Sequence, residues 1–181
     1  MKWYSNSIGS DLRVRVPPAA GRTDRVEFIE RELLATSPAS AEHDDVTQYL
    51  NEWSNRWVAD RYRVFIQTGL RLLKSESMLE PDIHWVDSKH RLGRPTAAVV
   101  PVVVEVSISS LDFDQTVKQR LYASEGIDEY WILDTINQRA VVHLNPDGDR
   151  YLSINTFGTE HSISPRRLLE AKLDLKWLFI E

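Results

Sequence analysis

The stretch AAVVPVVVEVSI, from Ala97 to Ile108, constrains the fold more than any other part of the chain. Its first part, from Ala97 to Val104, is the longest apolar run, and it is far shorter than the roughly 20 residues that a membrane-spanning helix needs. Its length and composition favour a buried strand. We therefore predict that this strand lies in the interior of a sheet.

The same strand carries a charged residue, Glu105, among its valines. Successive side chains of a strand point to opposite faces of the sheet. One face carries only apolar side chains, namely Val100, Val102, Val104, Val106 and Ile108. The other face changes from apolar to polar along the strand, and Glu105 stands at the change. A buried, unpaired carboxylate costs roughly several kcal/mol of desolvation, so Glu105 needs a positive partner, which a metal ion, a lysine or an arginine would provide.

Asp82 is the candidate for a second carboxylate beside Glu105. In the segment EPDIHWVD, Ile83 and Trp85 point to one face, while Asp82 and His84 point to the other. An aspartate at the start of one strand, near the glutamate of an adjacent strand, forms an oxygen site that suits magnesium or manganese. By itself, an aspartate after a proline is more typical of a turn.

Lys118 follows on a short helix predicted over 111–126, with Asp112 as its N-cap and Gly126 as its stop. Asp114 and Lys118 are four residues apart and share a face of this helix. The spacing alone favours a solvent-exposed ion pair. The alternative is that the lysine turns toward the carboxylates, where it could orient a water or stabilise phosphate charge.

The remaining pattern predicts an α/β or α+β fold in which one mixed sheet is flanked by two helices. A strand pair is expected over 25–35, and an amphipathic helix over 39–60 with Trp53 and Trp57 in the core. Further strands are expected at 63–68, 70–74, 82–86, 129–134, 139–144 and 149–154, with a hairpin turn at 145–148 and an apolar tail that closes the core. Residues 1–24 read as an irregular arm and residues 25–181 as one domain.

Composition limits the class of protein. The chain has no cysteine and a net charge of −5, which argue against disulfides, thiolate metal sites and a general nucleic-acid coating protein. Its N-terminus contains no signal-peptide core. We expect a cytoplasmic protein without a membrane partner. An enzyme that acts on a polyanion stays compatible with this charge, because only the field near its site must be positive.

The segment from Val103 to Asp134 resembles the Uma-type restriction endonuclease family of the PD-(D/E)XK nuclease superfamily. The residues that match are Glu105 and Val106 on the strand, with a serine displaced to Ser107 or Ser109, then Asp114, Lys118 and Tyr122, and then Gly126, Ile127, Glu129, Tyr130, Trp131, Ile132 and Asp134. The segments EFIERELLATSPASAEH and LDLKWLF match as well, so that the resemblance covers roughly residues 25–180.

The resemblance implies a restriction-endonuclease-like fold and assigns roles to particular residues. It places the metal carboxylates on Asp82 and Glu105, the active-site lysine on Lys118, and an assisting glutamate on Glu27. The superfamily's usual lysine would fall at Ser107, so Lys118 has to reach the same place from the helix. His43 matches a histidine at a helix start, where a capping role is equally compatible. Arg31 replaces the family's turn glycine, so a differently shaped first hairpin is expected.

The implied activity is magnesium- or manganese-dependent hydrolysis of DNA phosphodiester bonds, which would make the chain an endonuclease. The alternative is a nuclease-fold module that binds or assembles without catalysis, and RNA or a branched junction would be other substrates. Lys89, Arg91 and Arg94 lie in the loop between the two metal-ligand strands and are the candidates for contacts with the DNA backbone. Cutting both strands of a duplex would favour a homodimer.

Overall fold

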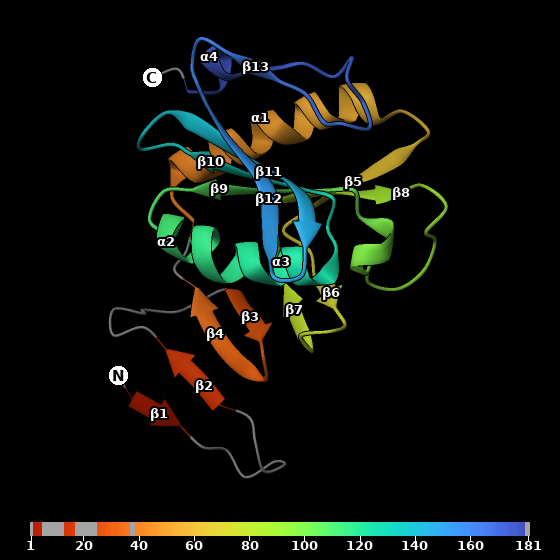
Figure 1. The fold of residues 1–181 in the computed structure, drawn as a ribbon. Helices are drawn as coiled ribbons and strands as arrows, with labels where there is room; N and C mark the ends of the chain where they lie inside the picture. The colour runs from red at the N-terminus through yellow and green to blue at the C-terminus, as the bar shows by residue number, and fades with distance from the viewer. Residues whose placement is uncertain (1, 5–12, 17–24, 37–38, 180–181) are drawn as a thin grey trace.

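The structure, a computed structural model, describes residues 2–4, 13–16, 25–36 and 39–179. A six-stranded sheet in the order β12-β11-β10-β9-β8-β5 forms its centre (Figure 1). The strands of this central sheet are β5 (Tyr62–Ile66), β8 (Ile83–Asp87), β9 (Val102–Ser107), β10 (Glu129–Asp134), β11 (Arg139–Asp147) and β12 (Arg150–Gly158). β9 and β10 run parallel and the other neighbours run antiparallel, so the mixed sheet predicted from the sequence is confirmed.

A second six-stranded sheet, in the order β1-β2-β4-β3-β7-β6, lies below the central sheet in Figure 1. Its strands are β1 (Lys2–Tyr4), β2 (Arg13–Val16), β3 (Arg25–Ile29), β4 (Glu32–Thr36), β6 (Leu70–Leu72) and β7 (Ser77–Leu79). The prediction of an irregular arm is wrong for β1 and β2, because β2 pairs with β4 and β1 pairs with β2, which makes these short segments regular. The rest of residues 1–24 lies outside the described residues. A two-stranded ribbon, β13 (Ser162–Ile163) with β14 (Leu173–Asp174), completes the strands described.

Helices cover both faces of the central sheet. α1 (Ala41–Val58) and the C-terminal segment with α4 (Leu175–Leu178) lie on one face (Figure 1). On the other face lies a continuous helical segment of α2 (Leu111–Phe113), a π-helical turn (Asp114–Lys118) and α3 (Gln119–Glu125), between the central sheet and the second sheet. Each face therefore has its own apolar core, and the valines of β9 contribute to both.

α1 follows the predicted amphipathic helix closely. The Ser40 side chain caps it by accepting a hydrogen bond from the His43 amide. Trp53 is buried, stacks on Trp85 and donates its indole N–H to a backbone carbonyl of the C-terminal segment. Trp57, predicted to lie in the core, is 37% exposed. The apolar stripe of the helix is wider than the surface against which it packs, so its margin stays in solvent.

Two other boundaries differ from the sequence prediction for backbone reasons. Residues Ala97–Val99 form a 3-10 turn rather than the start of β9. β9 begins directly after Pro101, which has no N–H to donate to a sheet ladder. The hairpin between β11 and β12 is present, but its turn lies at Gly148 and Asp149, after Asn145 and Pro146 have joined the strand.

The helical segment after β9 begins at Leu111 rather than after a cap at Asp112. Ser110 precedes it, and its hydroxyl donates to the side chain of Asp114 instead of capping the first turn. Gly126 ends α3 in the left-handed conformation at φ 81°, as predicted.

Arg31 adopts the positive φ of 70° that a glycine would take in the β3–β4 turn, and Glu30 adopts φ 47°. The turn therefore has the positive φ that a glycine permits, although no glycine is present, and a differently shaped hairpin stays a prediction. The non-glycine residues carry a cost of roughly 1–2 kcal/mol each. Partners outside the hairpin hold them there, because Glu30 pairs with Arg120 at 2.8 Å and Arg31 with Glu76 at 3.5 Å.

His84 of β8 is 0% exposed, and neither of its ring nitrogens has a hydrogen-bond partner among the described residues. Its ring lies 5.4 Å from that of Phe65. Burial without a partner disfavours the imidazolium form and lowers the pKa of His84 from 6.5 to about 3. The histidine is therefore a neutral member of the core.

This burial makes folding sensitive to acid. The unfolded chain takes up a proton at His84 below pH 6.5 and the folded chain does not until about pH 3, so stability is lost as the pH falls through this window. We expect a loss of about 2 kcal/mol from pH 7 to about pH 5 that is absent from His84→Leu. Urea unfolding of both proteins, followed by tryptophan fluorescence at the two pH values, measures the difference. Equal pH dependence of the two proteins would contradict a neutral buried His84.

Candidate active site

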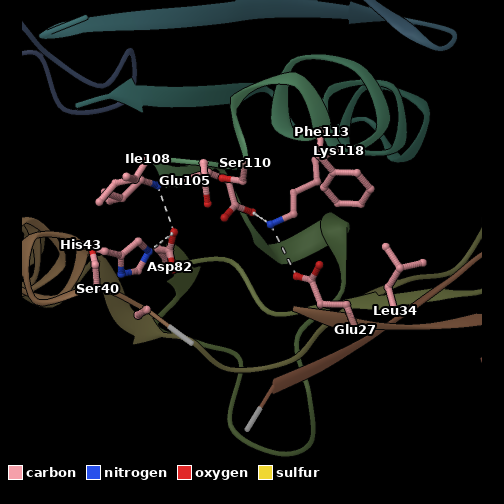
Figure 2. A pocket seen from close by; sticks show the side chains of 13 residues that line it. Glu27, Leu34, Ser40, His43, Asp82, Glu105, Ile108, Ser110, Phe113 and Lys118 are labelled. Carbon is pink, nitrogen blue, oxygen red and sulfur yellow. Dashed lines mark hydrogen bonds and ion pairs between the residues drawn. The ribbon is translucent and has the colours of Figure 1, made fainter. Parts of the chain in front are cut away.

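A pocket of about 330 Å³ lies between the two sheets and the N-terminus of α1. Glu27, Asp82, Glu105 and Lys118 line it together, and Figure 2 shows their side chains pointing toward one another. They come from β3, the residue before β8, β9 and the end of the π-helical turn. The four residues singled out as catalytic candidates thus meet in one place.

The register of β8 and β9 explains why Asp82 and Glu105 are neighbours. The two strands are antiparallel, and Ile83 lies opposite Val104. The next position along each strand therefore brings Asp82 beside Glu105 on the same face of the sheet. Asp82 is 4% exposed and Glu105 is 2% exposed, so both carboxylates are buried.

Lys118 supplies the positive charge among these acids. Its Nζ lies 3.0 Å from Glu105 Oε1, 3.5 Å from Glu27 Oε1 and 3.5 Å from Asp114 Oδ1. The solvent-exposed pair favoured by helix spacing alone is wrong, because Asp114 is 1% exposed and Lys118 8%. The helical segment packs with this face toward the carboxylates rather than toward solvent.

The electrostatics keep the Lys118 amine charged. Burial lowers the pKa of Lys118, but the charges of Glu105, Glu27 and Asp114 outweigh burial and raise this pKa well above its usual value. An ammonium group with three donors therefore faces three carboxylates.

Asp82 has partners that the sequence did not reveal. His43 Nε2 lies 3.1 Å from Asp82 Oδ2, and the amide of Val106 donates to the same oxygen at 3.0 Å. Burial by itself raises the pKa of Asp82. The hydrogen bond and the charge of His43 are the largest of several effects that lower this pKa, and together they bring it below its usual value. The side chain of His43 therefore serves Asp82, while the cap of α1 is Ser40.

Glu105 receives a hydrogen bond from the buried Tyr122, whose hydroxyl lies 2.7 Å from Oε1. Burial raises the pKa of Glu105 well above its usual value, against the opposing charge of Lys118. Tyr122 was matched to the family pattern without a role. The sequence does contain a signal for its position in the site. Tyr122 follows Lys118 by four residues, so both side chains lie on one face of the helical segment.

Glu27 leaves one oxygen uncommitted. Its Oε1 accepts the amide of Glu80 at 3.0 Å and faces Lys118. Its Oε2 is buried and has no hydrogen-bond partner among the described residues. A buried carboxylate oxygen without a donor is unusual, and it marks a place where a cation or a water would be stabilised.

The donor set suits a hard cation. Asp82 and Glu105 offer carboxylate oxygens side by side, which magnesium and manganese prefer. Within the described ranges, no three histidine, aspartate or glutamate side chains form a ready-made ion cage. Magnesium commonly uses only one or two carboxylates and completes its shell with water and substrate phosphate, so the residues present fit such an ion.

The basic loop is not part of this pocket. Lys89, Arg91 and Arg94 are exposed and follow the C-terminal end of β8, whereas Asp82 precedes its N-terminal end. The length of the strand, at about 3.3 Å per residue, therefore separates them from the carboxylates. They do not line the pocket.

Comparisons with known proteins identify the proteins that this chain is similar to. The model of a family described as "Uma2: Putative restriction endonuclease" matches residues 12–177. The uncharacterized protein sll1609 of Synechocystis sp. is 29% identical over 135 residues, which cover 71% of this chain and 76% of that protein. The crystal structure of "a putative nuclease belonging to DUF820" from Anabaena variabilis superposes with a TM-score of 0.69 at 16% identity, and covers 85% of this chain and 89% of the other. This last likeness shows the fold.

No helix in the described part of the chain is long and apolar enough to cross a membrane.

Removing the ammonium group should destabilise the protein, because it leaves buried carboxylates without their cation. We expect Lys118→Met to lower the free energy of unfolding at neutral pH by roughly 3–5 kcal/mol. Urea denaturation measures this loss. Lys172→Met, at an exposed lysine, is the matched control and should change stability little. Equal stability of the two variants would contradict the central place given to Lys118.

Proposed function

The chain belongs to the Uma2 family, and from this premise we propose that it is a divalent-metal-dependent endonuclease that hydrolyses DNA phosphodiester bonds. One observation carries the proposal. Two buried carboxylates, Asp82 and Glu105, stand side by side in an open pocket, with the Lys118 amine 3.0 Å from Glu105. Hydrolysis of a phosphodiester needs a site for a cation, a positioned water and a positive group for the developing charge, and this arrangement offers all three.

Asp82 and Glu105 would hold magnesium or manganese. Bound there, such an ion polarises the phosphate and lowers the pKa of an attacking water. His43 and the Val106 amide keep Asp82 ionised and fixed in orientation. Tyr122 fixes Oε1 of Glu105 through its hydroxyl, which leaves Oε2 as the oxygen with fewer commitments.

Lys118 and Glu27 would act on the water and the phosphate. The Lys118 amine holds its protons at Nζ and can donate one hydrogen bond to a phosphate oxygen or to the attacking water. Glu27 can accept a hydrogen bond from the same water through its free Oε2. The Lys118 amine lies 3.5 Å from Oε1 of Glu27, so the two groups are close enough to hydrogen-bond to one molecule placed beside them.

DNA is the proposed partner, and Lys89, Arg91 and Arg94 stay proposals for contacts with its backbone beyond the pocket. A homodimer would provide two sites for the two strands of a duplex. A cytoplasmic location stays a prediction from the composition, which includes no cysteine.

The main test is the replacement of Glu105 by its neutral isostere. We expect Glu105→Gln to abolish DNA cleavage in the presence of magnesium or manganese, because the amide cannot hold the cation. Time courses on single-stranded and duplex DNA, with and without EDTA, measure the activity. Protein from a strain without competing nucleases excludes contamination.

Glu129→Gln is the matched control for this experiment. Glu129 is also a glutamate with 2% exposure, but it lies outside the pocket and binds Trp131 and the Arg166 amide. The two hydrogen bonds go to different oxygens of Glu129, so the amide keeps one of them and loses the other without touching the pocket. Cleavage should persist in the folded variant, and circular dichroism checks its fold. Cleavage that survives Glu105→Gln would remove the proposed role of the carboxylate pair.

Metal binding gives a second test that does not need activity. Isothermal calorimetry with manganese should show a binding heat for the native chain and a strongly reduced one for Asp82→Asn. Asp87→Asn, at the other end of β8, should leave the heat unchanged. If the native chain gives no heat that depends on Asp82, a binding or assembly module without catalysis becomes the better interpretation.

A further inference from the structure

We propose that Asp114 is a positioning residue that holds the Lys118 amine in the active site, and that Ser107 and Ser110 hold Asp114 in turn. This inference rests on the proposed function for its kinetic test. It concerns residues that have no place in the metal site or in the chemistry assigned above.

The two oxygens of Asp114 have separate partners. Oδ1 lies 3.5 Å from Lys118 Nζ. Oδ2 accepts a hydrogen bond of 2.6 Å from the Ser107 hydroxyl and another of 2.6 Å from the Ser110 hydroxyl. Since Asp114 is 1% exposed, water does not compete with these contacts. The two hydroxyls thus fix the plane of the carboxylate, and with it the direction of the oxygen that faces the amine.

The backbone around Asp114 is held as well. The Tyr130 hydroxyl donates to the Asp114 carbonyl at 3.1 Å from the neighbouring strand β10. Asp114 and Lys118 begin and end a π-helical turn, a rare conformation that often occurs at functional sites. The position of the turn over the sheet is therefore fixed at its first residue, four residues before the amine that it presents.

Asp114 differs from the other two carboxylates around the amine. Glu105 and Glu27 approach from the two sheets, and both would turn toward a cation or a water once the site is loaded. Asp114 belongs to the same helical segment as Lys118, and its second oxygen is already occupied. It is the carboxylate that can keep the long, flexible lysine in place while Glu105 serves the cation.

Ser107 relates this support to the metal site. It lies two residues after Glu105 on β9, so the two side chains share a face of the sheet. The strand that carries Glu105 thereby also sets the position of Asp114, and through it the position of the amine. One rigid strand fixes the spacing between carboxylate and lysine.

The kinetic test is a double-mutant cycle. Asp114→Asn should lower kcat by roughly 10- to 100-fold, with KM little changed. In a Lys118→Met background the same substitution should have almost no further effect, because Asp114 acts through the amine. Asp112→Asn is the control, an exposed aspartate on the same helical segment. If the loss of kcat in the double variant is instead the product of the losses in the two single variants, Asp114 has a merely structural role and the proposal is overturned.

A second measurement needs no nuclease activity and separates failure of this proposal from failure of the proposed function. Acetic anhydride labels amines, and peptide mass spectrometry gives the rate at Lys118. This rate should rise several-fold in Asp114→Asn and to a lesser degree in Ser107→Ala and Ser110→Ala, which remove one hydroxyl each. The exposed Lys172 in the same samples corrects for differences in reagent, and circular dichroism reports any general change in the fold. An unchanged Lys118 rate in all three variants would overturn the proposal, whether or not the native chain cleaves DNA.

Discussion

The structure depends on one buried ammonium group placed among acids from different parts of the chain. Moving a charged amine and its partners out of water costs several kcal/mol per ion, which is recovered only where the opposite charges are close and well oriented. Lys118 meets this condition by contacting Glu105 of the central sheet, Glu27 of the second sheet and Asp114 of its own helical segment. The same contacts therefore connect three layers of the structure, and Glu27, Glu105 and Lys118 also line the pocket. The site and the junction between the layers are one physical arrangement.

The sequence predicted the central part of this arrangement because strand periodicity is strict. Alternation along β9 places Glu105 on the face opposite the uniformly apolar one, and the cost of a buried acid requires a cation. A lysine was one of the three partners left open for Glu105, and the structure places Lys118 in that position. Helix spacing alone could not choose it. Spacing tells which residues share a helix face, but not whether that face packs inward, which depends on the docking of the whole segment.

Other features escaped prediction because they depend on contacts distant in sequence. His43 and Asp82 are 39 positions apart, and no local pattern links a histidine in the first turn of α1 to the start of β8. β2 forms through pairing with β4, and β1 through pairing with β2, rather than from apolar periodicity of their own. The basic loop at 87–95 lies away from the pocket for a topological reason. A loop between two antiparallel strands lies at one end of them, and here Asp82 and Glu105 lie toward the other.

The charge of the pocket bears on how the proposed cofactor and substrate would cooperate. Glu27, Glu105 and Asp114 surround a single ammonium group, and Asp82 lines the same pocket. With these acids ionised, the pocket repels a phosphate as it stands. Burial is the main cause of the raised pKa of Glu105, the charge of Lys118 opposes it, and the neighbouring acids raise it further. A divalent cation would reverse the local field and make the same pocket attractive to a phosphodiester. On the proposed function, the cation would therefore recruit the substrate as well as activate water. A net charge of −5 is then compatible with a nuclease, because the field that matters is assembled only when the ion binds.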